Sequence, residues 1–257
     1  MGFRIQHPGT LRLHNHAVGT WLSIRDAFFS LLFPRDCPGC TQRLAYPEVI
    51  CASCEAALKR ILAPFCSKCG APMPAHWKVK TCPVCKTRKS PLSRVRSVCT
   101  YDDLIKRMIR DVKYSQKTRY TRFFAELLFP ILKLQFPASV EAIVPVPLHR
   151  KRQWERRYNQ TELIAKELAQ LTGLPVCHLL VKSKITKPQS SLSGLARWRN
   201  LKDSFDCVET NPVPRSIVLL DDVITTGATL QACAIALRRA GVRRVYALTV
   251  ARSVKRF

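Results

Sequence analysis

The pattern of apolar and polar residues becomes regular after residue 97. From there, short apolar segments of strand type alternate with longer segments whose apolar residues recur every third or fourth position. The strand-type segments are 97–101, 141–147, 175–181, 216–220 and 244–251. The helix-type segments are 102–115, 120–136, 159–173 and 229–241. This alternation predicts an α/β fold, in which helices flank a mostly parallel sheet.

Particular residues mark the boundaries of the predicted helices. Asp102 or Asp103 is placed to cap a helix, because an aspartate side chain accepts a hydrogen bond from a free backbone N–H. Gly173 is placed to end another helix, since glycine readily adopts the left-handed conformation. Pro130 falls inside the helical pattern of 120–136, where it would bend the helix.

The first part of the chain has shorter, interrupted apolar runs. The run at 21–33 has only thirteen residues and contains Arg25 and Asp26, so it is too short to span a bilayer. We expect a helix that packs into a core there, with contact to a membrane surface as the alternative. The stretch 86–97 is basic and contains Pro91, which predicts a linker.

Cysteine spacing gives the strongest signal in the chain. Eight of the twelve cysteines form four Cys-x-x-Cys pairs, with ten residues between the first two pairs and twelve between the last two. Two such pairs can close a tetrahedral zinc site through four thiolates. We therefore expect two structural Zn2+ sites, held by consecutive tetrads. The ligands would be Cys37, Cys40, Cys51 and Cys54 in one site, and Cys66, Cys69, Cys82 and Cys85 in the other.

Other interpretations of these cysteines are weaker. Disulfides are disfavoured in the reducing compartment that we expect, and a redox Cys-x-x-Cys would need a surrounding βαβ pattern. A crossed pairing of the four motifs stays open, and His76 lies inside the second module as a spare ligand. Four further cysteines fit small buried apolar residues. They are Cys99, Cys177, Cys207 and Cys233.

Charge narrows the class of partner. The chain of 257 residues has 43 Lys and Arg against 17 Asp and Glu, a formal net charge of +26, and is 47% hydrophobic. It can build a core, and its charge favours polyanions such as nucleic acid, phosphorylated metabolites or anionic membranes. We find no secretory signal or transmembrane segment and expect a cytoplasmic protein.

The segment 215–232 joins a buried strand to a helix through polar residues. The strand delivers Asp221 and Asp222 to the carboxyl edge of the sheet, where ligands bind in such folds. The following Thr-Thr-Gly-Ala-Thr turn opens a helix, whose free N–H groups and dipole favour an anion. Carboxylates beside a phosphate site make sense if they face hydroxyls, which suggests a 5-phosphoribosyl ligand. The alternative is a polar strand end followed by a helix cap.

Residues 217–230 resemble the phosphoribosyl pyrophosphate (PRPP) motif of type I phosphoribosyltransferases. Four Cys-x-x-Cys pairs, then the basic segment 143–165, then 187–205, then this motif, follow one another in an order that resembles the ComF family. The resemblance covers roughly 31–252. It divides the chain into four expected regions: an N-terminal extension with an apolar helix at 1–36, a double zinc ribbon at 37–85, a linker at 86–97 and a phosphoribosyltransferase-like domain at 98–257.

The resemblance also implies roles for single residues. Asp221 and Asp222 would hold the ribose hydroxyls, and the turn would hold the 5′-phosphate. That turn comprises Thr225, Thr226, Gly227, Ala228 and Thr229. Pyrophosphate, bridged by Mg2+, would lie at a basic loop after the strand at 141–147. The loop residues are Pro147, Leu148, His149, Arg150, Arg156, Asn159 and Gln160. The family often has glycine where this chain has Arg157, which puts the loop geometry in question.

Basic and aromatic residues leave a second interpretation open. Trp154, Tyr158 and Trp198 lie among arginines and lysines, a pattern that suits stacking on single-stranded DNA as well as pyrophosphate binding. The segment 182–202 is basic and polar, typical of a mobile flap. The resemblance to the ComF family, which is implicated in DNA uptake, implies a PRPP-binding protein that acts in DNA uptake and has transferase activity. The alternatives are a non-catalytic DNA-binding adaptor for a competence helicase or uptake channel, and a nucleotide-salvage transferase.

Overall fold

The protein is described by a computed structural model that covers residues 35–183, 204–208 and 211–254. Its contacts divide the chain into two compact units, 1–55 and 56–257. In the first unit, β1 (Arg35–Asp36) pairs with β2 (Arg43–Leu44) in an antiparallel hairpin, and a short helix, α2 (Ala52–Ala56), follows. This hairpin brings two Cys-x-x-Cys turns into one small module.

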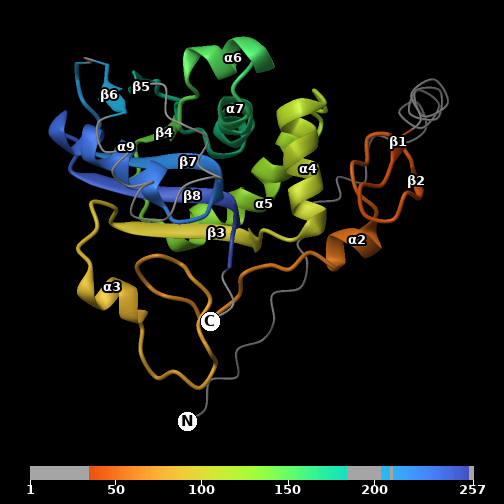
Figure 1. Cartoon of the computed structure of the whole chain (residues 1–257), viewed down its shortest axis with the longest axis horizontal. Coiled ribbons are helices and arrows are strands. Elements are labelled where there is room, and N and C mark those ends of the chain that lie inside the picture. The colour runs from red at the N-terminus through yellow and green to blue at the C-terminus, as the bar shows by residue number, and fades with distance from the viewer. Residues whose placement is uncertain (1–34, 184–203, 209–210, 255–257) are drawn as a thin grey trace. The chain divides into compact units, whose positions relative to one another are not determined.

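A parallel sheet forms the centre of the second unit. Its four strands are arranged in the order β3-β8-β7-β4, and every neighbouring pair is parallel (Figure 1). The strands are β3 (Arg94–Thr100), β4 (Ala142–Pro145), β7 (Ser216–Ile224) and β8 (Arg244–Arg252). Most of their residues are buried, as expected for strands covered on both faces. The predicted α/β fold with a mostly parallel sheet is therefore confirmed.

Helices cover both faces of this sheet. On one face, α5 contacts β3 and β8, α7 contacts β4 and β7, and α4 packs on α5. On the other face, α9 contacts β7 and β8 together with a small hairpin of β5 and β6 (Figure 1). The bounds are α4 (Asp103–Tyr114), α5 (Tyr120–Gln135), α7 (Gln160–Thr172), α9 (Ala228–Arg239), β5 (Leu180–Lys182) and β6 (Phe205–Cys207). One buried core joins α9, the hairpin and the sheet.

The helices follow the predicted apolar faces and caps. In α4 the buried side chains recur at helical spacing: Ile105, Met108, Ile109 and Val112. Asp102 caps this helix by accepting a hydrogen bond from the Ile105 N–H at 3.2 Å. At the end of α7, Gly173 has a φ of 75°, the left-handed conformation expected of it. Pro130 lies inside α5.

Several strand boundaries differ from those predicted. Within 175–181, Val176 forms an isolated bridge to Ile143, and only Leu180 and Val181 belong to a strand, β5, whose antiparallel pairing with β6 was not predicted. The sequence signal failed because three-residue strands are too short for an alternating pattern. The strand β3 begins at Arg94, inside the stretch predicted as a linker. The central strand β7 continues through both aspartates to Ile224.

The second cysteine module belongs to the same unit as the sheet. It ends in the short helix α3 (Pro83–Thr87), and it is joined to β3 by a hydrogen bond from Val95 N–H to the Lys68 carbonyl and by a bridge between Arg60 and Cys99. The division at residue 55 therefore lies between the two tetrads rather than after both of them. The apolar helix expected at 21–33 lies outside the described residues.

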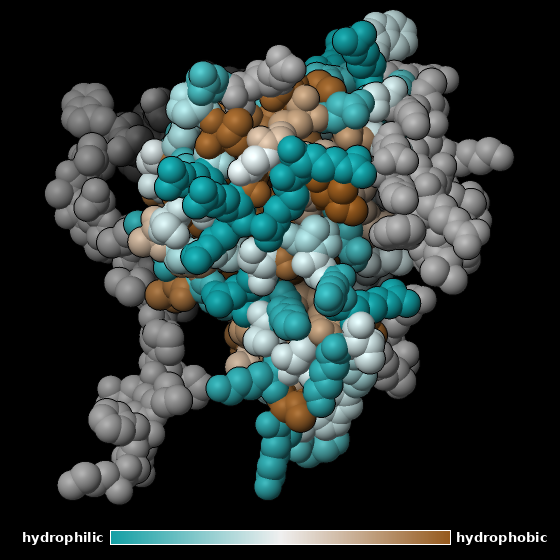
Figure 2. All heavy atoms as spheres, turned by 90° about the vertical axis from the view of Figure 1, so that its left-hand side faces the viewer, coloured by the Kyte–Doolittle hydropathy of each residue, from teal (hydrophilic) through white to brown (hydrophobic). Residues whose placement is uncertain are grey.

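Polar residues dominate the described surface on the side shown in Figure 2. Hydrophilic side chains cover much of that face, and smaller apolar areas lie between them. No helix among the described residues combines the length and the apolar character that crossing a bilayer requires. The polar surface fits the large excess of lysine and arginine in the sequence.

Candidate functional site

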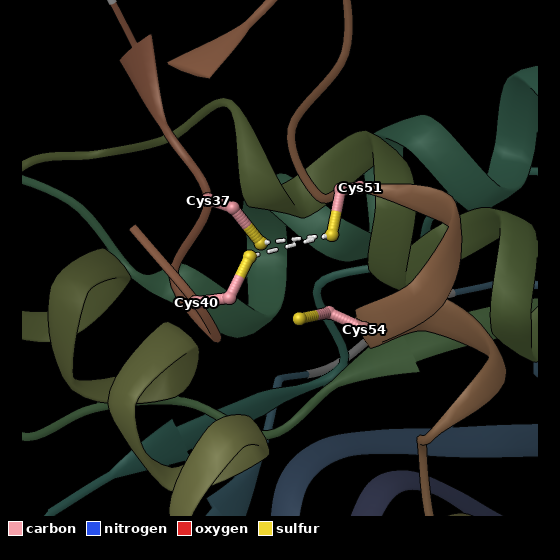
Figure 3. A group of neighbouring side chains, drawn as sticks. All are labelled: Cys37, Cys40, Cys51 and Cys54. Carbon is pink, nitrogen blue, oxygen red and sulfur yellow. Dashed lines mark hydrogen bonds between the residues drawn. The ribbon is translucent and has the colours of Figure 1, made fainter. Parts of the chain in front are cut away.

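The first tetrad is assembled by the hairpin and the start of α2. The sulfur atoms of Cys37, Cys40, Cys51 and Cys54 point toward one another (Figure 3) and lie within 4.8 Å of one another. The Cys51 sulfur is 3.6 Å from both the Cys37 and the Cys40 sulfur. The backbone N–H of Gly39 also points at the Cys37 sulfur, at 3.4 Å.

The second tetrad has the same arrangement. Its sulfur atoms also lie within 4.8 Å of one another, and that of Cys69 is 3.8 Å from that of Cys82. Gly70, with a φ of 70°, forms the tight turn after Cys69. A Cβ at this glycine would lie 2.6 Å from the Val95 carbonyl oxygen, so only glycine fits between the turn and β3.

Both tetrads fit a zinc ion. Four sulfur atoms at about 2.3 Å from a tetrahedral metal lie about 3.8 Å from one another, close to the spacings found here. The tetrads are consecutive, as predicted, and His76 is exposed and belongs to neither. Of the four remaining cysteines, Cys99 and Cys233 are buried and Cys177 and Cys207 are half-buried. Closed sites with four thiolates hold structure, and leave no open position for chemistry.

A second group of chemically active residues lies where β7 ends. Asp221 and Asp222 are consecutive residues of this strand, so their side chains lie on opposite faces of the sheet. Asp222 is 4% exposed, and it interacts with residues of α4 and α7. Asp221 interacts with Lys182 of β5 and Cys233 of α9 on the other face. The two carboxylates therefore face different elements, although Lys113 also interacts with Asp221.

Asp222 is part of a network of polar side chains. Lys113 Nζ lies 2.7 Å from its Oδ2 atom, and Gln160 Nε2 donates a hydrogen bond to the same oxygen at 2.8 Å. Gln160 accepts in turn from Arg156 at 3.1 Å, and Arg156 lies over the Tyr114 ring at 4.8 Å. Burial alone would lower the pKa of Lys113, but attraction to Asp222 outweighs it and raises that pKa. The network brings the predicted residues Arg156 and Gln160 to the predicted carboxylate.

The Asp221 carboxyl group has a strongly shifted pKa. Burial and the neighbouring Asp222 charge raise its pKa to about 7, and Lys113 and Lys182 partly oppose this effect. One of its oxygens accepts a hydrogen bond from the Asp222 backbone N–H at 2.8 Å. At neutral pH this carboxyl group is therefore poised between its charged and neutral forms.

The turn between β7 and α9 has the geometry of an anion site. Thr225 and Thr226 are exposed, and Gly227 has a φ of 78° at the N-cap of α9. The Ala228 N–H contacts the Thr226 hydroxyl at 3.4 Å, while Thr229 is half-buried in the first turn. Because the first N–H groups of a helix have no intrahelical acceptors, this turn presents backbone donors directly after the strand that carries both carboxylates.

The predicted basic loop contains a helix that the sequence did not reveal. Residues Arg150–Arg156 form α6, directly after the half-buried residues Pro147, Leu148 and His149. Arg150 is exposed. Asn159 caps α7 by accepting from the Thr161 N–H at 3.1 Å, and its amide donates to the Val146 carbonyl at 3.0 Å. The loop is thus tied to the end of β4, beside β7.

The residue that replaces the family's glycine has a backbone conformation that glycine favours. Arg157 has a φ of 66°, in the left-handed region that glycine adopts without strain. The side chain of Tyr158, next in the chain, donates a hydrogen bond to the Val112 carbonyl. Tyr158 therefore has a structural role, whereas Trp154 is 83% exposed. Trp198 and the flap expected at 182–202 lie outside the described residues, except for 182 and 183.

Comparison with known proteins identifies the family to which this chain belongs. The profile of the double zinc ribbon domain matches residues 28–86. Competence protein F of Haemophilus influenzae is 31% identical over 214 residues, which cover 79% of this chain and 90% of that protein. The chain belongs to the ComF family. Competence protein ComFC of Bacillus subtilis is 31% identical over 199 residues, 76% of this chain and 80% of the relative. DNA utilization protein YhgH of Escherichia coli is 30% identical over 213 residues, which cover 80% of this chain and 91% of that protein.

Solved structures similar to this ComF chain include phosphoribosyltransferases. Adenine phosphoribosyltransferase from Leishmania tarentolae has a TM-score of 0.35 and 12% identity, covering 55% of this chain and 74% of that enzyme. Hypoxanthine phosphoribosyltransferase from Staphylococcus aureus has a TM-score of 0.32 and 11% identity, covering 51% and 62%. Similarity at this level has no bearing on the activity of the ComF chain.

Two site residues of this ComF chain escaped the sequence analysis. Lys113 and Lys182 lie on either side of the aspartates, although neither stands in a recognisable motif. Lys113 directly follows Val112, a buried residue of α4, so the helical pattern itself placed it beside the core. A lysine at the edge of an apolar helix face is the signal that was available.

Proposed function

We propose that this ComF-family chain is a PRPP-binding, phosphoribosyltransferase-like protein that acts in DNA uptake. The main support is the arrangement at the end of β7, where Asp221 and Asp222 adjoin the Gly227 turn at the N-terminus of α9. Relatives named for competence and for DNA utilization support the cellular role. The zinc ribbons would serve as structure and as a docking module.

The proposed ligand has a part for each feature of the edge. Its 5′-phosphate would accept hydrogen bonds from the N–H groups and hydroxyls of 225–229. Its ribose hydroxyls would donate to Asp221 and Asp222. Lys113 and Gln160 both contact the Oδ2 atom of Asp222, so a ribose would share this carboxylate with them.

Transfer chemistry at this edge would depend mainly on positive charge. When the bond from the anomeric carbon to pyrophosphate breaks, negative charge grows on the leaving group and a nucleophile forms the new bond to carbon. Arg156 and the exposed Arg150 would stabilise that charge. Bound Mg2+ would add charge neutralisation at the pyrophosphate.

Isothermal titration with PRPP and Mg2+ tests the proposal. We expect micromolar binding that is lost in the Asp221→Asn/Asp222→Asn double variant. Asp206→Asn, which changes an exposed aspartate in β6, is the matched control and should bind normally. Absence of PRPP binding by the folded wild-type protein would contradict the proposal. If PRPP binds, a screen for pyrophosphate release with candidate bases and nucleotides would identify the acceptor.

One observation favours a second candidate, a non-catalytic adaptor for single-stranded DNA. Trp154 in α6 is 83% exposed and Tyr114 at the end of α4 is 68% exposed, and both lie among arginines. Exposed aromatic rings beside arginines suit stacking on bases. This candidate predicts salt-sensitive DNA binding that Trp154→Ala weakens, with no PRPP binding. A salvage transferase without a DNA role predicts negligible DNA binding at physiological salt.

A further inference from the structure

Two arginines are buried where the second cysteine module meets the sheet. Arg96 of β3 is 7% exposed and Arg252 of β8 is 8% exposed. A buried guanidinium normally needs a negatively charged partner, because removing its charge from water is costly. Among the described residues, the ion pairs with carboxylates involve neither of them.

Both arginines donate hydrogen bonds to the turn that carries the second tetrad, and Arg96 also donates to the Gln135 side-chain oxygen at 2.5 Å and to the Val95 carbonyl at 2.7 Å. Arg96 donates to the carbonyls of Cys66 and Ser67 at 3.4 and 3.2 Å, and its guanidinium lies 4.7 Å from the centre of the Phe65 ring. Arg252 donates to the Cys69 carbonyl. The Arg252 Nε atom is buried and has no hydrogen-bond partner among the described residues. Both cations are therefore held against the ligands of one metal centre.

The charge of that centre matches the two arginines. Four thiolates around one Zn2+ leave two negative charges, which would have to be buried beside the sheet. Arg252 interacts electrostatically with all four cysteines of the tetrad, and Arg96 does so with Cys66 and Cys69. Two guanidinium groups balance two negative charges.

The first tetrad has no such compensation in the part of the chain that is described. None of the buried charged side chains falls within 35–55. Arg43 in its hairpin forms an exposed pair with Asp36 at 3.5 Å, and Arg35 lies over the Tyr46 ring. Two zinc sites with the same ligands thus differ in the charge around them.

We propose that Arg96 and Arg252 are the counter-cations of the second zinc–thiolate centre, and that they make its zinc far slower to leave than the zinc of the first. Cations placed beside thiolates stabilise the metal-bound, charged form over the metal-free form. The first centre then loses and regains zinc without disturbing the second unit. The second centre keeps its zinc for as long as the sheet is folded.

Zinc release from the full chain tests this proposal. The protein is loaded with two zinc ions and mixed with excess 4-(2-pyridylazo)resorcinol, a coloured chelator, and release is followed by absorbance. We expect a fast and a slow phase of one equivalent each, and Cys54→Ser should remove the fast phase. Arg252→Met should speed the slow phase by roughly 10–100-fold, the usual effect of removing a partner beside a metal ligand.

Matched variants separate charge from packing. Arg244→Met changes an exposed arginine at the start of the same strand and should leave both phases unchanged. Arg252→Lys keeps the charge and should keep the slow phase within about threefold of wild type, even if Arg252→Met fails to fold. The proposal is overturned if the second centre of Arg252→Lys releases its zinc as fast as the first centre does. It is also overturned if folded Arg252→Met releases this zinc at the wild-type rate.

Discussion

The cysteine tetrads and the carboxylate edge, which is the end of β7 with Asp221 and Asp222, are both clusters of groups with the same charge. The protein balances this charge in different ways. Each tetrad has four thiols within 4.8 Å and needs a cation from outside the chain. At the edge, Asp221 and Asp222 receive their cations from the chain, through Lys182 on one face and Lys113 on the other. The comparison indicates that metal binding should control the stability of the tetrads, whereas side-chain packing and pH should control the edge.

The largest expected effect comes from removing a ligand of the second tetrad. Cys66→Ser should lower the thermal midpoint of the second unit by more than about 10 °C, because zinc binding contributes several kcal/mol to the folding of such modules. Calorimetry together with zinc content would measure it. Cys37→Ser is the matched control: it should also lose one zinc, yet leave that midpoint unchanged. Equal shifts for the two variants would remove the distinction between the tetrads.

The next largest effect concerns the cation of the edge. Lys113→Met leaves the buried Asp222 carboxylate with Gln160 alone, which should lower the free energy of unfolding by about 2–4 kcal/mol. Urea denaturation would measure this loss, and adding Asp222→Asn should restore part of it. Lys117→Met is the matched control, because Lys117 pairs with Asp111 and is more exposed than Lys113. It should change the free energy of unfolding by less than about 1 kcal/mol. Similar losses for both lysines would contradict the network.

A pH-dependent effect should follow from Asp221. Its pKa is about 7 in the folded protein against an ordinary value of 3.8, so the folded state binds this proton more tightly than the unfolded state. The associated stability is complete below pH 4 and is lost as the pH rises to about 7. Asp221→Asn should therefore gain on the order of 1–3 kcal/mol over wild type at pH 8 compared with pH 5, in urea melts. A difference that does not vary with pH would exclude the raised pKa.

The smallest expected effect concerns the backbone that leads to Gln160. Arg157→Gly should raise the free energy of unfolding by about 0.5–1 kcal/mol, because glycine adopts a φ of 66° without a Cβ clash. Arg152→Gly, inside the neighbouring helix α6, should lower it by a similar amount. If Arg157→Gly does not stabilise the protein, or if Arg152→Gly stabilises it equally, the predicted backbone strain at Arg157 is contradicted.

Sequence alone was sufficient where a few neighbouring residues determine the structure. Cys-x-x-Cys turns place two sulfur atoms by local geometry, so the membership of both tetrads could be predicted. The same holds for the caps at Asp102 and Gly173, which act within one turn of their helices. These are short-range features, which do not depend on how the sheet is ordered.

Features that depend on distant segments could not be predicted in the same way. The partners of Asp222 come from α4 and α7, roughly 110 and 60 residues earlier in the chain, and only the sheet order brings them together. Likewise, nothing in the local sequence at Arg96 or Arg252 indicates that they face the second tetrad. The antiparallel hairpin of β5 and β6 was missed because the pairing of these short strands, rather than their sequence pattern, defines it.

The position of β8 inside the sheet has a consequence for biosynthesis. This strand lies between β3 and β7, although its residues 244–252 follow both of theirs in the chain. The strand β3 is therefore synthesised well before the strand that joins it to β7. Until then β3 and β7 keep unpaired edges, which are prone to aggregation, so a chaperone that shields nascent chains should raise the yield of this protein more than that of a chain whose sheet forms in order.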